Sequence, residues 1–547
     1  MLKAGCFFMK TKRVIYCYIA FVLLANALIL RLWYLTNSSE LAQAAARQQS
    51  YTVTIARQRP DFFDRFGEPL TGEGTRTLAV LFPDQTASWN AAAFLNEDGL
   101  KALEEGMKGD MPFALQLAET PPQWALSNTV SLRQRLCASS LLTHLIGYTD
   151  AEGKGVCALE RAFEPYLSAN TVSLQLRLTV DAVGGMVQGS EAELIAPQQQ
   201  AAGIRLAVDR DVQRIAEQAA DRYIQRGAVV VLDVQSGDIL AWVSRPDYNR
   251  LNVAAELSRS DGALLDRVTL PYPAGSVYKV VVAAAALEAG TDPMWPYVCS
   301  GSIEVDGVQF QCNNGTAHGA LTMETALCCS CNCYFIALGQ QLGAAPILQM
   351  ARQLGFGSAP QLCSSFESGA GNLPAEAQLQ SAAQLALHCF GQGQLLVTPL
   401  QTAAMMRAVA AGGSYVSPQL VLGVGGEAAV RMQPQQAMTQ ENAAILSGFL
   451  AQVVQQGTGR AGVPQSCTAA AKTGTAQTGQ FDESGKERLI GWYGGWFPAE
   501  APKYVALVMM EGVTYGSADA GPVFAAIADA LMVQNGEEQG GLPPAVG

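Results

Sequence analysis

The stretch Pro273-Ala274-Gly275-Ser276-Val277-Tyr278-Lys279 carries more information about this chain than any other. It places a serine hydroxyl and a lysine amine three residues apart at the predicted start of a helix, where side chains at i and i+3 share one face. A serine is a weak nucleophile without a neighbouring base, and a buried lysine beside a second cation can lose its proton and serve as that base. The stretch therefore predicts a serine acyl-transfer site that needs no histidine.

Two further motifs strengthen this prediction, because a serine and a lysine at this spacing also occur on ordinary solvated helices. Ser330-Cys331-Asn332 follows Ser276 by 54 positions. Lys472-Thr473-Gly474-Thr475 follows Ser330 by 142 positions, inside a strand-like run over residues 467–478. The order, spacing and predicted context of the three motifs agree with one another.

With these motifs the chain resembles a class B penicillin-binding protein, a monofunctional peptidoglycan d,d-transpeptidase. The combination S-x-x-K, S-D-N and K-T-G occurs in class A β-lactamases and in penicillin-binding proteins. Cys331 in place of the aspartate suits the looser S-x-N pattern of the latter. Residues 227–252, 390–401 (FGQGQLLVTPLQ) and 59–67 (RPDFFDRFG) also resemble the family. In the last of these, Pro60 and Phe62 replace a glycine and an isoleucine, which bears on N-terminal packing and not on the reaction.

The predicted elements give an α+β domain with one antiparallel sheet. Two strands (228–232 and 239–243) precede a helical insertion, and three strands (467–478, 490–497 and 504–510) precede a last helix over 522–533. Asp209 or Asp211 is predicted to cap a helix that runs to Gln225. Further helices are predicted near residues 276–290, 322–342, 378–389, 398–411 and 438–456.

The resemblance implies the penicillin-recognising serine transferase (β-lactamase-like) fold, with a five-stranded antiparallel sheet, helices on both faces and an all-helical subdomain. A membrane anchor and an N-terminal pedestal would precede it. The expected boundaries are 1–36 for the cytoplasmic tail and single anchor, 37–202 for the dimerisation-like pedestal, 203–535 for the transpeptidase domain and 536–547 for a flexible tail. The pedestal would include the segment HLIGY at residues 144–148.

The resemblance also implies a role for each motif residue. The nucleophile would be Ser276, the base Lys279, the proton relay Ser330 and the second cation Lys472, and the backbone N–H groups of Ser276 and Thr475 would form the oxyanion hole. The expected catalytic residues are Ser276, Lys279, Ser330, Asn332, Lys472 and Thr475. The expected substrate-binding residues are Asn332, Thr473, Gly474 and Thr475.

Three other functions compete with the transpeptidase: a d,d-carboxypeptidase, a β-lactamase and a non-catalytic β-lactam sensor, in that order. A β-lactamase needs a base for its deacylating water, and no glutamate can be assigned to that task. A sensor carries several membrane spans and a cytoplasmic effector, whereas about a dozen residues precede the apolar run here.

Composition excludes several classes of protein. A chain of 547 residues suggests two or three domains, and 49% hydrophobic against 15% charged residues indicates a globular protein. The net charge of −12 argues against a nucleic-acid partner. With three histidines and no H-E-x-x-H or G-x-x-x-x-G-K-[ST], zinc proteases and nucleotide hydrolases lose support, and we expect no cofactor. The expected partners are peptidoglycan stem peptides, β-lactam antibiotics and the cytoplasmic membrane. A polytopic glycosyltransferase is a further candidate partner.

The N-terminus predicts a membrane anchor. Basic residues precede an apolar run over residues 14–30, and Trp33 and Tyr34 follow it at the position of an interfacial belt. The positive charges would hold the N-terminus in the cytoplasm and place the remaining chain outside the membrane. A cleaved signal peptide is the rival interpretation, because residues 42–46 offer small side chains to a peptidase.

Thirteen cysteines are unusual for such a protein. Cys6 and Cys17 fall in or before the apolar run, which leaves eleven beyond it, an odd number that cannot all pair within one chain. Four cysteines crowd the middle motif, but the adjacent Cys328 and Cys329 do not fit zinc-ligand spacing, so we expect no metal and interpret the thiols as small core side chains. As a hypothesis, oxidation of Cys331 to a disulfide would distort the motif and inactivate the enzyme, and equal acylation rates with and without reductant would contradict it.

Overall fold

The computed structural model describes residues 5–38, 50–72, 74–83, 90–109, 111–122, 126, 129–137, 141–180, 193–195, 202–482 and 484–540. Residues 42–46, on which the signal-peptide interpretation depends, lie outside them, as does the end of the expected tail at 541–547. The chain forms two compact units. One comprises residues 1–58, 75–133 and 171–200, and the other comprises 59–74, 134–170 and 201–547.

Among its described residues, the first unit contains a long helix, a short helix and two small sheets. Helix α1 spans Gly5–Asn37, and all its apolar side chains between Lys12 and Asn37 lie outside any protein core. One sheet has the order β1-β6-β7 and the other β4-β3-β5. The strands are β1 (Ser50–Gln58), β3 (Gly74–Leu81), β4 (Phe113–Gln116), β5 (Thr129–Gln134), β6 (Val172–Thr179) and β7 (Glu193–Ile195), with helix α4 (Glu97–Gly106). Their inward faces form small apolar cores, one of which contains Ile55, Leu78 and Leu176.

The second unit is built on a five-stranded antiparallel sheet with the order β10-β9-β25-β24-β23. Its strands are β9 (Gly227–Asp233), β10 (Ile239–Arg245), β23 (Ala470–Phe481), β24 (Glu487–Phe497) and β25 (Tyr504–Val513). The strands carry nearly continuous apolar runs because both faces of the sheet are covered, as the burial of β9 and β10 shows. The predicted sheet is therefore confirmed.

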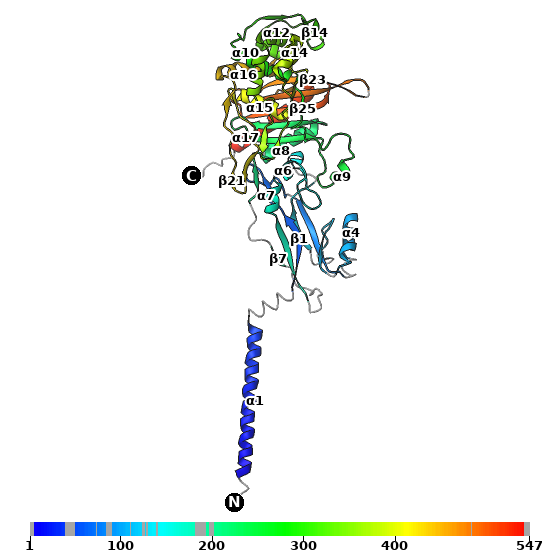
Figure 1. Cartoon of the computed structure of the whole chain (residues 1–547), viewed down its shortest axis with the longest axis vertical. Helices are drawn as coiled ribbons and strands as arrows, with labels where there is room; N and C mark the ends of the chain where they lie inside the picture. The colour runs from blue at the N-terminus through cyan, green and yellow to red at the C-terminus, as the bar shows by residue number, and fades with distance from the viewer. Residues whose placement is uncertain are drawn as a thin grey trace. The chain divides into compact units, whose positions relative to one another are not determined.

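Helices cover both faces of this sheet (Figure 1). Helices α8 (Arg210–Tyr223) and α17 (Gly516–Gly540) pack on one face, and α15 (Pro399–Ala410) packs on the other. Asp209 caps α8 as predicted, because its carboxylate accepts the N–H groups of Asp211 and Val212. Helix α17 begins earlier than the predicted 522–533 and extends to Gly540.

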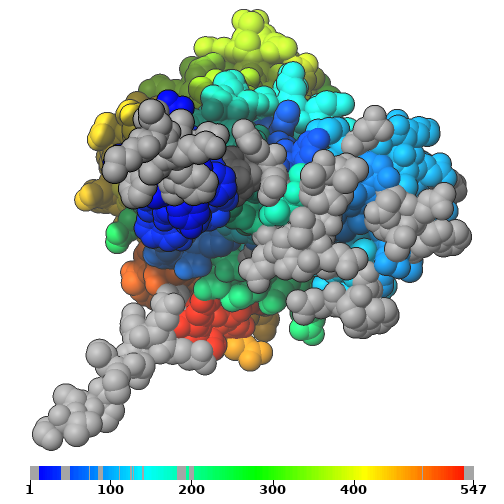
Figure 2. All heavy atoms as spheres, turned by 90° about the horizontal axis from the view of Figure 1, so that it is seen from below, coloured from blue at the N-terminus to red at the C-terminus, as the bar shows by residue number. Residues whose placement is uncertain are grey.

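Helix α17 passes a hydropathy test for a membrane span over Gly516–Gln534, yet half of that window is buried in the protein. Val523, Phe524 and Ile527 are fully buried in the core that α17 shares with α8 and the sheet. The opposite side of α17 reaches the surface, seen in red in Figure 2. This helix is therefore a core helix of the second unit, while the N-terminal helix is the better candidate for a span.

A helical subdomain packs next to α15, which its helix α16 contacts. Its helices are α10 (Lys279–Glu288), α11 (Met323–Cys328), α12 (Asn332–Leu342), α13 (Ala344–Gln353), α14 (Ala382–Cys389) and α16 (Gln440–Gln455). It also carries two short hairpins, β12 (Tyr297–Cys299) with β15 (Gly319–Leu321), and β13 (Ser302–Val305) with β14 (Val308–Gln311). The sequence did not predict α13 or the hairpins.

Two predicted helices differ from the structure at the motifs themselves. The predicted helix over 276–290 begins as a 3-10 turn, η1 (Gly275–Tyr278), before α10. The predicted helix over 322–342 is wrong as a single element, because it is broken into α11 and α12 at Ser330. Ser330 has a φ of 55°, a left-handed conformation that no α-helix contains.

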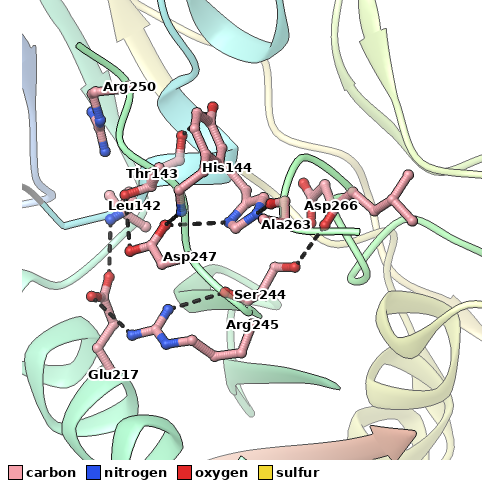
Figure 3. Close-up of polar contacts among 12 residues, drawn as sticks. Leu142, Thr143, His144, Glu217, Ser244, Arg245, Asp247, Arg250, Ala263 and Asp266 are labelled. Atoms are coloured by element: carbon pink, nitrogen blue, oxygen red, sulfur yellow. Dashed lines mark hydrogen bonds and ion pairs between the residues drawn. The ribbon is translucent and has the colours of Figure 1, made fainter. Parts of the chain in front are cut away.

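A polar cluster attaches the HLIGY segment to the sheet of the second unit (Figure 3). His144 lies on α5 (Thr143–Ile146), and its Nε2 is 2.7 Å from the carbonyl oxygen of Ala263. Glu217 on α8 accepts the N–H of Leu142 at 2.9 Å and pairs with Arg245 at 3.4 Å. Residues 134–170 therefore fold with the catalytic motifs, in the second unit.

Candidate active site

The turn η1 holds Ser276 against the edge strand β23. Gly275 has a φ of 57° and donates its N–H to the carbonyl oxygen of Gly391 at 2.8 Å. A Cβ built on Gly474 would lie 3.3 Å from the backbone nitrogen of Val277, so the absence of a side chain at 474 lets the turn lie on the strand. The hydroxyl of Ser276 is therefore carried by a turn that packs against the strand of the third motif.

The amine of Lys279 is fully buried at the first position of α10. Its Nζ donates to the carbonyl oxygen of Ser330 at 2.6 Å, to Oδ1 of Asn332 at 2.7 Å and to Oγ of Ser330 at 3.2 Å. The ring centroid of Phe335 lies 5.8 Å from the same nitrogen. Lys279 thus joins the first motif to both polar residues of the second.

Lys472 reaches the same hydroxyl from the sheet. This lysine is also fully buried, and its Nζ donates to Oγ of Ser330 at 3.1 Å and to the carbonyl oxygen of Thr473 at 2.9 Å. Ser330 can present its hydroxyl to both amines because the break between α11 and α12 turns it out of the helix. Two lysines and one serine from three separate motifs therefore form a continuous hydrogen-bonded path.

Burial controls the charge of the two amines. It lowers the pKa of Lys279 to about 8, against the opposing effect of negative charge on the neighbouring cysteines. Burial, followed by the positive charge of Lys279, lowers the pKa of Lys472 well below its usual range. The two shifts belong to a coupled pair, which gives up its first proton more readily than a free lysine does.

The remaining motif residues lie on one strand and one helix end. On β23, Oγ1 of Thr473 lies 2.8 Å from Oγ1 of Thr458, and Oγ1 of Thr475 accepts the N–H of Gly516 at 3.0 Å. Asn332 uses Nδ2 to donate to the carbonyl oxygen of Gln311 at 3.0 Å. Because β23 is the last strand in the sheet, its outer edge has no hydrogen-bonded neighbour among the described strands, and η1 contacts β23.

The structure brings all three motifs together, with Ser276 placed by the turn and Lys279, Ser330 and Lys472 joined by hydrogen bonds. Gly474 and Thr475 lie on the same strand next to that turn. The sequence did not single out three supporting residues, namely Gly391, Thr458 and Gly516. Gly391 lies in the FGQG segment quoted above, where a positive φ of 80° explains the glycine.

Residues 227–529 match the family described as the penicillin binding protein transpeptidase domain. The chain belongs to this family. Among curated relatives, Stage V sporulation protein D of Bacillus subtilis is 27% identical over 70% of this chain and 61% of its own length. Peptidoglycan D,D-transpeptidase PbpA of Mycobacterium tuberculosis is 29% identical over 56% of this chain and 66% of its own length. The matched part thus spans about three-fifths to two-thirds of these relatives.

Solved structures of family members share the fold. Penicillin binding protein 3 of Mycobacterium tuberculosis, complexed with ampicillin, has a TM-score of 0.64 and 23% identity, over 91% of this chain and 98% of the other. The D,D-transpeptidase domain of a peptidoglycan glycosyltransferase from Eggerthella lenta has a TM-score of 0.61 and 24% identity, over 87% and 98%. The predicted penicillin-binding-protein fold is confirmed.

Proposed function

We propose that the chain is a serine d,d-transpeptidase that cross-links peptidoglycan stem peptides through an acyl-enzyme and is acylated by β-lactams. The observation that carries the proposal is the convergence of two buried lysines, Lys279 and Lys472, on the hydroxyl of Ser330 beside the turn of Ser276. Membership of the transpeptidase family and the names of the relatives support it.

In the first step, Oγ of Ser276 attacks the carbonyl carbon between the two terminal d-alanines. Lys279 in its neutral form accepts the serine proton, which its lowered pKa makes possible near neutral pH. The C–N bond breaks, the terminal d-alanine leaves, and Ser330 passes a proton from the lysine pair to the departing amine. The backbone N–H groups of Ser276 and Thr475 would hold the oxyanion, each worth about 3 to 4 kcal/mol in other enzymes.

The donor peptide would bind as an extended strand along the free edge of β23, where Gly474 leaves room for the acyl group. Thr473 and Thr475 offer hydroxyls to its terminal carboxylate, and Lys472 offers a positive charge. Asn332 uses Oδ1 to hold Lys279, which leaves the second hydrogen of Nδ2 for the substrate amide. Binding of the carboxylate favours the protonated form of Lys472 and so the neutral form of Lys279.

In the second step, an amine from a neighbouring stem attacks the ester and forms the cross-link, while Ser276 regains its proton. A β-lactam undergoes the first step only, because the opened ring remains covalently attached to Ser276 and no leaving group departs. Helix α1 would anchor the chain in the cytoplasmic membrane, with the chain that follows α1 on the outer side. A polytopic glycosyltransferase would be the natural partner in that membrane.

The test uses the full chain purified in detergent under reducing conditions. Benzylpenicillin should add its mass once and persistently, whereas Ser276→Ala should show no adduct and the exposed-serine control Ser258→Ala should behave as wild type. A synthetic peptide ending in d-Ala-d-Ala, offered with a competing d-amino acid, should give the exchanged peptide. Hydrolysis alone would indicate a carboxypeptidase, an adduct that disappears as hydrolysed drug would indicate a β-lactamase, and a persistent adduct without peptide turnover would indicate a sensor.

A further inference from the structure

Four side chains that are scattered in the sequence meet behind the middle motif. Cys299 ends strand β12, Cys312 follows β14, His318 precedes β15 and Cys331 caps α12. Their ligand atoms all lie within 4.8 Å of one another. The expectation of no metal rested on Cys328 and Cys329, and neither belongs to this group. The group has the spacing C-x12-C-x5-H-x12-C. These long intervals do not indicate a metal site by themselves, and the four side chains meet only when the two hairpins fold.

The separations fit a tetrahedral ion. Zinc bonds of about 2.3 Å to sulfur and about 2.0 Å to nitrogen give tetrahedral edges of about 3.8 Å between two sulfurs and about 3.5 Å between sulfur and nitrogen. The Sγ atoms of Cys299 and Cys312 lie 3.7 Å apart, and those of Cys312 and Cys331 lie 3.5 Å apart. Nδ1 of His318 lies 3.5 Å from Sγ of Cys299.

The surroundings suit thiolate ligands. The three cysteines are at most 2% exposed, whereas His318 is partly exposed. Backbone N–H groups point at two of the sulfurs, from Gly301 to Cys299 and from Tyr334 to Cys331, each at 3.4 Å. Such outer hydrogen bonds orient and stabilise metal-bound thiolates. Cys331 also lies at the N-terminus of α12, which favours negative charge.

We propose that Cys299, Cys312, His318 and Cys331 bind one structural Zn²⁺. Three Zn–S bonds and one Zn–N bond form, and the three thiol protons pass to solvent. Cys333, whose Sγ lies 3.4 Å from that of Cys312, remains a neighbouring thiol outside the ligand set. The closed set of four protein ligands leaves no position for substrate, so the ion is structural and not catalytic.

The ion would affect the reaction only by holding the residues around Cys331 in place. Cys331 lies between Ser330 and Asn332, the two residues that hold the amine of Lys279. A zinc bond to Cys331 ties this segment to both hairpins and fixes the left-handed backbone at Ser330. This consequence rests on the proposed function, whereas the metal site itself does not.

The first measurement is metal content. The full chain, expressed with added zinc and purified in detergent with reductant, should hold about one zinc per chain by plasma mass spectrometry. Cys312→Ser should hold less than about a tenth of that, because a structural site rarely survives the loss of a central ligand. Cys328→Ser, a thiol of the same segment outside the set, should retain the wild-type amount.

The second measurement keeps the proposal testable if Cys312→Ser does not fold. The chain expressed with Co²⁺ should show the visible bands of a tetrahedral ion and a thiolate charge-transfer band. His318→Ala changes a partly exposed loop residue, so it should fold, alter these bands and release zinc faster to a chromogenic chelator. Unchanged bands and an unchanged release rate in His318→Ala would contradict the assigned ligand set.

Two outcomes would overturn the site outright: a folded chain without metal whose thiols all react with a thiol reagent, or a metal-free chain with a Cys312–Cys331 disulfide. Benzylpenicillin acylation of the same samples separates the two proposals. A chain that binds no zinc when purified but is acylated contradicts the metal site alone, and a chain that binds zinc but is not acylated contradicts the proposed function alone. When both hold, removal of zinc should slow acylation by about tenfold or more, since small misplacements of catalytic groups are costly.

Discussion

Lys279 and Lys472 each lack any exposed surface, and both donate to one serine hydroxyl. The spacing of the motifs predicted which residues would meet, because nucleophile, base and second cation must lie close together for the chemistry. It did not predict the bond from Lys279 to the carbonyl oxygen of Ser330. That bond depends on the left-handed backbone of Ser330 between two helices. Serine rarely adopts this conformation, so the residue type alone does not predict it.

The lysine pair predicts how acylation depends on pH. A protonated Lys279 cannot accept the proton of Ser276, and burial lowers its pKa from 10.5 to about 8. The second-order rate of acylation by a fluorescent penicillin should therefore rise with pH and level off above about pH 8, about two units earlier than for an ordinary lysine. The inflection belongs to the coupled pair and not to Lys279 alone.

The control for this profile is the drug signal of Ser276→Ala at each pH, which corrects for non-specific labelling. Lys279→Met should reduce the rate by about 10²-fold or more and remove the inflection, as expected for loss of a general base. A wild-type rate that is flat or falls between about pH 6 and about pH 9 would contradict the role of Lys279 as the base.

At the scale of elements, the sheet and most helices follow from the sequence, because each carries a continuous apolar run or an apolar periodicity of its own. The segment 322–342 shows where this fails. Its apolar pattern is helical on both sides of Ser330, so it predicts one helix. The break is specified by capping bonds, Ser330 N–H to Leu327 and Cys331 N–H to Ala326, and by contact of Cys328 with Thr458. The first two are local backbone bonds that any residue type can make, and the third depends on Thr458, more than a hundred positions away.

The FGQG segment supports the nucleophile turn, and a pair of glycines there gives a matched test. Gly391 and Gly393 have φ of 80° and 79°, so alanine strains both backbones by about 1 to 2 kcal/mol. A Cβ at 391 would collide with the carbonyl of Gly275, whereas a Cβ at 393 would make an ordinary contact with Leu387. Gly391→Ala should therefore slow acylation by about 10²-fold, because it displaces Ser276.

Gly393→Ala is the control, with the same backbone strain and no collision at the turn. It should acylate within about threefold of wild type, as expected for a small loss of stability away from the reacting atoms. Intact-mass time courses with benzylpenicillin measure both rates. Equal losses in the two variants would show that the strain at positive φ, and not the contact with Gly275, governs the effect.

At the scale of the whole molecule, segments remote in sequence are joined by buried charge. Glu160 has no exposed surface and pairs with Arg135 and, at 3.3 Å, with Arg59. Arg59 opens the RPDFFDRFG segment, and Arg135 also donates to the carbonyl oxygen of Pro60 at 2.9 Å. The sequence suggested a family likeness for this segment but could not reveal its partners, since charge pairs leave no periodic signal.

Loss of Arg135 should leave the carboxylate of Glu160 buried with one partner fewer. Arg135→Met should lower the free energy of unfolding by about 3 to 5 kcal/mol, the usual cost of breaking a buried ion pair. Urea unfolding of the full chain in detergent, followed by tryptophan fluorescence, measures this. Arg161→Met, an exposed arginine on the neighbouring α6 (Ala158–Ala162), is the matched control and should change stability little.

The double variant Arg135→Met/Glu160→Gln separates charge from packing. Because it removes the unpaired buried charge, it should recover part of the stability lost in Arg135→Met. A double variant less stable than the single one by the full cost of a second core defect would contradict the electrostatic explanation.

The N-terminal helix predicts that the mature chain remains attached to the membrane. Its candidate span of 26 residues, Lys12–Asn37, is about 39 Å long at 1.5 Å per residue, which exceeds a hydrocarbon core of about 30 Å. The full chain should resist extraction from membranes by alkaline carbonate, and intact mass should include residues 1–38. A variant that begins at residue 50 should appear in the soluble fraction and still form the benzylpenicillin adduct. A mature chain that starts after residues 42–46 and is released without detergent would show instead that the helix is a cleaved signal.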